Sequence, residues 1–369
     1  MTEHGDRRAI RRGVLALALF SCISANAQER CTIDAQGTLN GWNHAWSAMR
    51  SHVPIPTAAP SLVAYVVDAG TNSIRGYAVD AEAGILTPLK SPSVRTQDYP
   101  FFIAAHPSGQ YVYVANLRSN SVSGYAVDAK NGALRPLPNP VAQTGALPWA
   151  IAVHPSGNFA YVLNAGSNSI SAFAVDPKTG ALGAHSTHAL EGDSTPQGIA
   201  IAPGGRFVYV GLAGHNVLVG FAIDIASGAL RQMPDTPISL PSAPESVISD
   251  ANGHVIHVRL GSSGWLSYEI DAHDGHLTPL LQQNAATQTQ PAHGGRCLAI
   301  FDYVSAMSFS WPRDIAADPG RQYAFVVQKD KHLVLTYRLD TSDSRERSVL
   351  SAVEAGAQPV AITLVELHR

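Results

Sequence analysis

Short apolar runs separated by polar turns recur along the chain at a constant spacing. Residues 148–182 contain two such runs, a polar turn, a third run with alternating polar positions, and an Asp-to-Gly turn. The same pattern occupies residues 100–134 and returns more loosely from Pro196 and Pro244. Runs rich in aromatic and β-branched residues and bounded by turn residues are typical of strands. In the unit that begins at Pro148, the predicted strands are Ile151–Val153, Phe159–Leu163, Ser169–Val175 and the residues after Leu182.

Three residue types keep the same phase through six units. The second-strand tyrosine recurs in steps of 48 residues, with His257 and then Phe325, after a step of 68, taking its place. A four-stranded unit repeated at this period predicts an all-β fold, a β-propeller with six complete blades. The columns are Tyr65, Tyr113, Tyr161 and Tyr209; the opening prolines Pro100, Pro148, Pro196, Pro244, Pro312 and Pro359; and the turn aspartates Asp80, Asp128, Asp176, Asp224, Asp271 and Asp340.

The first unit begins at its second strand, near Leu62–Val67, with no first strand before it. The end of the chain, Pro359–Leu364, matches a first strand. We therefore expect the C-terminal strand to complete the first blade and close the ring. The propeller then forms one domain over residues 61–369, with a long insertion at about 281–308 that is too short for a seventh blade.

Residues 1–27 have the features of a secretory signal peptide. Arginines precede an apolar segment at 13–23, and Ala25–Ala27 forms a cleavage site before Gln28. The apolar segment is too short to span a bilayer, so no membrane span is expected in the mature chain. The mature protein is then periplasmic or secreted, with residues 28–60 as an N-terminal tail and Pro-rich linker.

Two other export signals remain open. Arg11-Arg12 is compatible with a twin-arginine signal, and Cys22 with the attachment site of a lipoprotein. After cleavage at residue 27, the remaining cysteines are Cys31 and Cys297. Two thiols in an oxidising compartment predict one disulfide, although two unpaired buried thiols are the alternative. They are too few for a structural zinc site.

Composition and motifs exclude several classes of function. The net charge of -3 gives no basic surface for phosphates, so a nucleic-acid partner is not expected. The chain contains no G-x-S-x-G elbow, H-E-x-x-H motif, phosphate-binding glycine loop or EF-hand loop. We therefore predict neither a metal nor a cofactor.

The repeated segments P-x-x-I-A-x-H-P-S-G, Y-V-x-N and S-N-S-V-S resemble those of the bacterial β-propeller lactonase family, which includes 6-phosphogluconolactonase-like proteins and propellers with Tyr-Val-Thr-Asn-type repeats. The resemblance covers residues 61–366 and rests on scaffold positions. It implies a propeller that is usually seven-bladed, against the six repeats counted, and a lactone as substrate. The family's sugar-phosphate lactonases work in the cytoplasm, whereas this chain carries an export signal.

The repeat also separates scaffold from site, because a single ligand needs no residue in several copies. His106 and His154 occupy the same turn in consecutive units, so we interpret them as structural. Asn116 and Asn164 are interpreted in the same way. The residue after each opening proline, at the mouth of the channel, does not repeat at all. This column reads Phe101, Trp149, Gln197, Glu245, Arg313 and Val360.

Glu245 and Arg313 are the candidate catalytic pair. For a lactone, a carboxylate positions or deprotonates the attacking water, and an arginine stabilises the developing oxyanion. An ion pair that closes the ring is the alternative. Phe101 and Trp149 would stack on a sugar ring or plug the channel, with Gln197 beside them. The remaining candidates are Arg118 and Arg259, for a carboxylate or phosphate, and His215, as a weaker base.

Two functions fit these residues. The first is a lactonase-like hydrolase that acts on a sugar or related lactone by metal-free acid/base chemistry. The second is a non-catalytic propeller that binds a small molecule or a protein through the same face. A propeller scaffold serves either purpose, so the fold does not decide between them.

Overall fold

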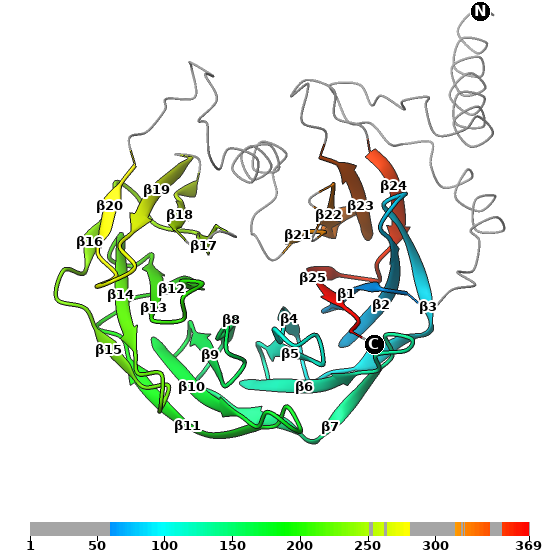
Figure 1. Cartoon of the computed structure of the whole chain (residues 1–369), viewed down its shortest axis with the longest axis horizontal. Helices are drawn as coiled ribbons and strands as arrows, with labels where there is room; N and C mark the ends of the chain where they lie inside the picture. The colour runs from blue at the N-terminus through cyan, green and yellow to red at the C-terminus, as the bar shows by residue number, and fades with distance from the viewer. Residues whose placement is uncertain are drawn as a thin grey trace, which may run out of the picture.

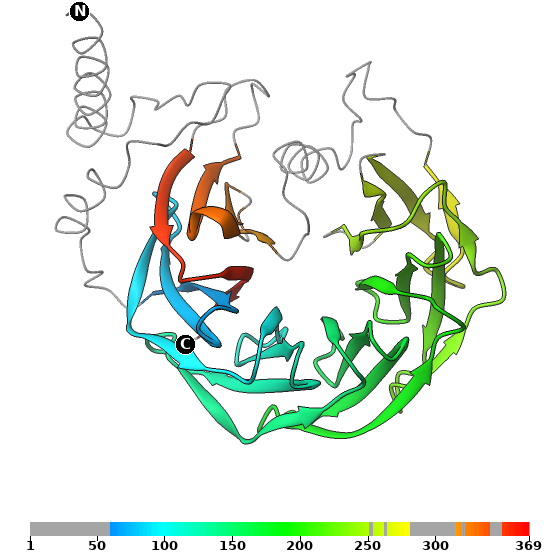
Figure 2. The same ribbon diagram turned by 180° about the vertical axis from the view of Figure 1, so that it is seen from behind.

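The computed structural model describes residues 60–250, 254–261, 264–280, 314–318, 320, 322–339 and 349–368. These residues form six antiparallel sheets that lie side by side on an arc (Figure 1), and one strand of each sheet faces the centre of the arc. The view from behind shows the same arrangement (Figure 2). The described residues are thus a β-propeller, as the sequence predicts.

The sheets follow the chain, except for the first. The first contains β25 (Pro359–Glu366), β1 (Leu62–Asp68), β2 (Ser73–Asp80) and β3 (Ile85–Arg95). The second contains β4 (Pro100–Ala105), β5 (Tyr111–Asn116), β6 (Ser121–Val127) and β7 (Leu134–Gln143). The third contains β8 (Pro148–Val153), β9 (Phe159–Asn164), β10 (Ser169–Val175) and β11 (Leu182–Ala189).

The fourth sheet contains β12 (Pro196–Ile201), β13 (Phe207–Leu212), β14 (Val217–Ile223) and β15 (Leu230–Gln232), with the short β16 (Ile238–Ser239) also paired to β14. The fifth contains β17 (Ser246–Ser249), β18 (Val255–Arg259), β19 (Trp265–Ile270) and β20 (Leu277–Pro279). The sixth contains β21 (Ile315–Ala317), β22 (Tyr323–Gln328), β23 (Leu333–Arg338) and β24 (Val349–Glu354). The 3₁₀ helix η3 (Lys329–Lys331) connects β22 to β23.

The core lies between the sheets. In the first four sheets the second strand is largely apolar on both faces, and every residue of β1, β5, β9 and β13 is buried. A strand that packs against neighbours on both sides has no solvent face, which is why its sequence is a continuous apolar run and not an alternating one.

Repeated hydrogen bonds join one blade to the next. The hydroxyl of Tyr113 donates to the carbonyl of Gly180 over 2.8 Å, and that of Tyr161 to the carbonyl of Gly228 over 2.9 Å. Burial raises the pKa of both phenols. Nε2 of His106 lies 2.9 Å from the carbonyl oxygen of Gly157 in the next turn, and His154 repeats this contact. These contacts confirm the structural interpretation of the two histidines.

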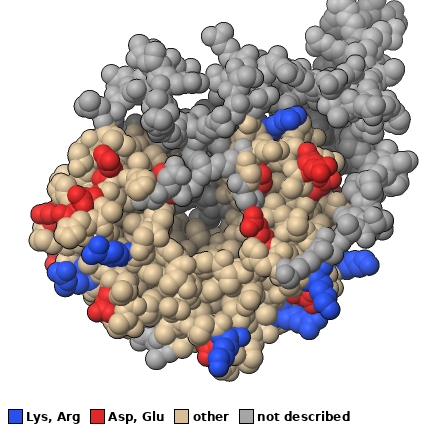
Figure 3. Space-filling model, viewed as in Figure 1, with Lys and Arg blue, Asp and Glu red and all other residues tan. Residues whose placement is uncertain are grey.

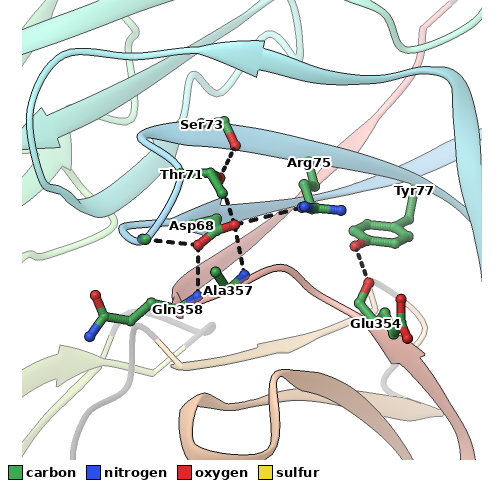
Figure 4. Close-up of polar contacts among 9 residues, drawn as sticks. Asp68, Thr71, Ser73, Arg75, Tyr77, Glu354, Ala357 and Gln358 are labelled. Carbon is green, nitrogen blue, oxygen red and sulfur yellow. Dashed lines mark hydrogen bonds and ion pairs between the residues drawn. The ribbon is translucent and has the colours of Figure 1, made fainter.

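The last strand completes the first sheet, as predicted. β25 pairs with β1 from Leu62 opposite Glu366 to Val67 opposite Ala361. The buried carboxylate of Asp68 holds the entry to β25 (Figure 4), because it accepts backbone hydrogen bonds from Ala357 (3.0 Å) and Gln358 (2.8 Å). Residues 281–313, which separate the fifth sheet from the sixth along the chain, lie outside the described residues.

Several sequence predictions also lie outside the described residues. They are the signal peptide at 1–27, the tail up to residue 59, the disulfide between Cys31 and Cys297, and the insertion at 281–308. In the part of the chain that the structure describes, no helix has the length and apolar character of a membrane span.

Candidate functional site

The loops that lead into the inner strands and the loops that follow the second strands lie together on one face of the arc of sheets. This face is the end at which the inner strands begin. The side-chain oxygen of Asn72 accepts the backbone N–H of Tyr99 over 3.0 Å, and Asn120 accepts that of Leu147 over 2.9 Å. Asn72 and Asn120 have positive φ angles, which asparagine tolerates better than most residues. This end of the arc is therefore fixed by bonds between neighbouring blades.

Most side chains of the non-repeating column stand at β-bulges at this end. The register of the inner strand shifts at Phe101, Trp149, Gln197 and Val360, each of which has no partner position on the neighbouring strand. A bulge bends the strand and redirects its side chain. The backbone thus repeats at this column while the chemistry of the side chains does not.

Phe101 and Trp149 meet across two adjacent blades. Their ring centroids are 4.4 Å apart, with the planes tilted by 43°. Phe101 is buried and Trp149 is partly buried. Tilted ring pairs at this distance are favourable and rigid. They form one apolar wall of the candidate site.

Glu245 pairs with Arg259 of its own sheet. Oε2 of Glu245 lies 3.3 Å from Nε of Arg259, and the side chains are 39% and 13% exposed, respectively. The N–H of Glu245 also donates to the carbonyl of Arg259 over 2.8 Å. The structure therefore places the predicted carboxylate beside a different arginine from the expected Arg313, which lies outside the described residues.

The family model of the lactonase, 7-bladed β-propeller, matches residues 28–248, more than half of the chain. The chain belongs to this family. No curated protein matches the chain. Among solved structures, the lactonase-type propeller resembles a Bacteroides fragilis protein assigned provisionally as a 6-phosphogluconolactonase, with 17% identity and a TM-score of 0.55, over 84% of this chain and 86% of that one. It also resembles the periplasmic gluconolactonase of Pseudomonas aeruginosa, with 15% identity and a TM-score of 0.50, over 84% of this chain and 100% of that one.

At these identities the structural neighbours support the fold of the lactonase family and nothing finer. The seven blades named by the family model compare with six sheets among the described residues. The six repeats counted in the sequence correspond one to one with those sheets.

Two predicted residues lie on the surrounding loops of the lactonase-type propeller. The guanidinium carbon of Arg118 sits 4.4 Å from the ring centre of Tyr99, a cation–π contact at an exposed position. His215 is exposed, next to Gly192, which lies in the loop that leads into the same sheet. Neither is paired with Glu245 or with the aromatic wall in the contacts of the described residues.

Sequence reasoning missed two polar groups at this end. The carboxylate of Asp68 also accepts the hydroxyl of Thr71 over 2.6 Å and lies 3.8 Å from Nε of Arg75 (Figure 4). These hydrogen bonds hold the pKa of Asp68 below its usual value even though burial opposes the shift. The signal was available, because Asp68 stands in the column of Asn116 and Asn164. Ser246, the other group, had no such signal.

On the face seen in Figure 3, acidic side chains border the central hollow. The molecule is hollowed at the centre of the arc, and the lysines and arginines visible on this face lie away from the hollow (Figure 3). Among the described residues there is no group of three His, Cys, Asp or Glu side chains able to hold a metal ion. The groups available for chemistry at the mouth are therefore aromatic rings, an amide and one carboxylate–guanidinium pair.

Proposed function

We propose that this member of the lactonase family hydrolyses a lactone at the end of the arc where the inner strands begin. The observation that carries the proposal is the non-repeating column, which sets an aromatic wall, an amide and a carboxylate on the successive inner strands β4, β8 and β12 and at the start of β17. Scaffold positions repeat around the arc. A single ligand needs a different side chain from each blade, and the positions that differ from blade to blade form this column.

The Glu245 side chain has the exposure needed to reach water, and Arg259 fixes its direction. In the proposed reaction, the oxygen of a water attacks the lactone carbonyl carbon while Glu245 accepts its proton. The ring C–O bond then breaks, and the same proton passes to the departing alkoxide oxygen. The product is the open hydroxy acid, and Glu245 returns to its ionised form.

Replacing Glu245 by glutamine tests this role. The E245Q change keeps the size of the side chain but removes the proton acceptor, so kcat should fall by about 10²–10⁴-fold. The assay follows acid release from a panel of sugar lactones and alkyl lactones. The matched control is E269Q, an exposed glutamate of β19 in the same sheet. Equal turnover by wild type and E245Q, or no turnover of any lactone, would contradict the proposal.

The same ion pair favours a second function, namely binding without catalysis. A carboxylate oriented by a guanidinium can recognise a ligand through hydrogen bonds as well as transfer a proton. In this case E245Q would weaken capture of a ligand or protein while no lactone is turned over. A pull-down from periplasmic extract that retains a partner in stoichiometric amount supports this second function.

We further propose that the protein acts outside the cytoplasm. Residues 1–27 carry the arginine-rich start, apolar segment and Ala25–Ala27 site that motivate this proposal. The full chain, expressed in a Gram-negative host, should appear in the periplasmic fraction with Gln28 as its first residue. Edman sequencing of that fraction checks the boundary. An intact N-terminus in the cytoplasmic fraction would overturn the proposal.

A further inference from the structure

The outer strand of the third sheet, β11, has one side on which no strand of the described residues pairs. It lies on the outer rim of the arc (Figure 1) and pairs with β10 alone. The ring of His188 in this strand packs edge to face on Phe221 of the next sheet, with the ring centres 4.9 Å apart. Edge strands present N–H and C=O groups to other chains, and proteins protect them with prolines, charged side chains or bulges. An edge without this protection is available for pairing.

The other two long outer strands, β3 and β7, carry all three kinds of protection. β3 contains Pro88, Lys90 and Pro92, and β7 contains Arg135 and three prolines. A shift of register divides the pairing of each strand, so that at most four consecutive positions of β3 and three of β7 keep one register. The remaining outer strands have six residues or fewer. Each of these edges is therefore short, interrupted or charged.

β11 differs from them in sequence and in register. Its residues, LGAHSTHA, include no proline, aspartate, glutamate, lysine or arginine. The register shift of this strand lies near its start, and the five consecutive positions from His185 to Ala189 pair with β10 in one register. β11 therefore has the longest regular edge among the described outer strands, and it lacks the residues that prevent pairing with another chain.

The directions of the backbone groups follow from one hydrogen bond at the end of the strand. The N–H of Leu190 donates to the carbonyl of Asn168 over 2.8 Å, so it points towards β10. Backbone groups alternate between the two sides of an antiparallel strand, so those of residues 186 and 188 also point towards β10. The residues between them direct their N–H and C=O groups away from the sheet, and they are His185, Thr187 and Ala189.

A second copy of the chain fits this edge about a two-fold axis at Thr187. Antiparallel pairing then sets Thr187 opposite its own equivalent, and His185 opposite Ala189 in both directions. In each of these pairs the two residues exchange both N–H···O bonds, so no outward group of the three is left unpaired. Opposed threonines are a favourable cross-strand pair, and the strand holds no Asp, Glu, Lys or Arg to bring like charges together. The edge is thus complementary to itself in direction, register and charge.

We propose that the protein forms a symmetric dimer in which the β11 strands of two copies pair antiparallel and join the two third sheets into one. The same strand serves on both sides of a two-fold contact, so the assembly closes at two copies and does not extend into a fibre. β11 is the outermost strand of its sheet, and β8, at the candidate mouth, is the innermost. This inference is therefore independent of the proposed function.

Sedimentation velocity over a concentration series tests the dimer. T187P removes the outward N–H and leaves the bonds to β10 in place, as proline on an edge strand does. T187K sets two ammonium groups opposite each other. Each change should raise the dissociation constant of the dimer about tenfold or more, because T187P removes two hydrogen bonds and T187K adds repulsion. V141K is the matched control, since Val141 of β7 is exposed and lies opposite Ser123 as Thr187 lies opposite Ser171. V141K should dimerise like the wild type.

Cysteine cross-linking tests the register of the pairing. Opposed residues that exchange both hydrogen bonds have Cα atoms about 5.5 Å apart, a separation that a disulfide spans. Under mild oxidation, T187C should therefore form a covalent dimer, and V141C, which carries the same natural cysteines, should not.

Three results would overturn the inference. They are a wild type that stays monomeric up to several hundred micromolar, dimerisation that T187P and T187K leave unchanged, and an equal loss of dimer in V141K. Far-UV circular dichroism of each variant shows that a lost dimer is not a lost fold, because folded T187K should keep the spectrum of the wild type.

Discussion

One position at the end of the second strand is asparagine in two blades and aspartate in the first. In the first blade the neighbouring inner strand, β25, comes from the C-terminal end of the chain. In the second and third sheets, Asn116 and Asn164 donate their side-chain N–H groups to serine hydroxyls of the next strand. In the first sheet the same position is Asp68, which accepts two backbone N–H groups at the start of β25. Hydrogen bonds to a charged acceptor are roughly twice as strong as neutral ones. The carboxylate therefore anchors β25 at its start, which is the end opposite to the one where a turn joins the first two strands in the other blades.

Replacing Asp68 by asparagine restores the residue type of the other blades and tests this role. The D68N change leaves one oxygen for four donors, so the free energy of unfolding should fall by about 1–3 kcal/mol at neutral pH. Denaturant unfolding measures this difference. D193N, an exposed aspartate, should leave stability unchanged.

The difference should also depend on pH in a defined direction. The pKa of Asp68 is lowered in the folded protein, so its stabilisation is complete above the ordinary carboxyl pKa of about 4 and is lost as the pH falls through the lower folded value. The stabilities of wild type and D68N should therefore converge in acid. A difference that persists unchanged well below pH 4 would show that the charge plays no part.

Residue roles could be predicted from the sequence where they repeat. The structural assignment of His106 and His154 followed from their phase, and the inter-blade hydrogen bonds confirm it. The pairing of Glu245 with Arg259 was not predicted, because each residue was compared only with the residues at the same position in the other units. Their contact follows from the antiparallel register of β17 and β18, in which Ser246 lies opposite Arg259. Phase along the chain does not give that register.

At the level of elements, the strand that matters most is β25, because it joins both ends of the propeller in one sheet. It pairs with β1 along its length and also packs against β4 of the next blade. Val360, Ile362 and Val365 are buried in it. Its position could be predicted because Pro359–Leu364 repeats the text of a first strand. The short β16 pairs with β14 as the last residues of β3 pair with β2, so it is the end of the outer strand of the fourth sheet. The break between β15 and β16 could not be predicted from the repeat.

Deleting residues 358–369 should destabilise the protein far more than an ordinary tail truncation. Each large apolar side chain removed from the core contributes about 1.5–3 kcal/mol, and three are lost together with the hydrogen bonds of β1. Thermal unfolding should shift to much lower temperature or become non-cooperative. Deletion of 368–369 alone, which leaves β25 and the buried Leu367, is the control. An unchanged melting temperature for the longer deletion would contradict the role of β25.

For the whole molecule, the sequence repeat predicts the arrangement of the sheets, but it does not predict the structure of segments that lack the repeat. Six sheets on an arc, their order and their contacts follow from the phase of one column of tyrosines, whose hydroxyls bond to the next blade. Residues 281–308 have no counterpart in other units, so there is no phase from which their structure could be inferred. The family model names seven blades, and the described residues form six sheets.

The direction of β25 has a practical consequence for handling the protein. This strand starts at Pro359, beside the candidate mouth, and ends at Glu366, whose carbonyl lies against the turn at Gly109 on the opposite end of the arc. The backbone N–H of Leu367 donates to the carbonyl of Ser61, which secures the exit there. A polymer, affinity tag or sensor surface attached after β25 would therefore lie on the face opposite the aromatic wall and Glu245, and would leave both facing the solution.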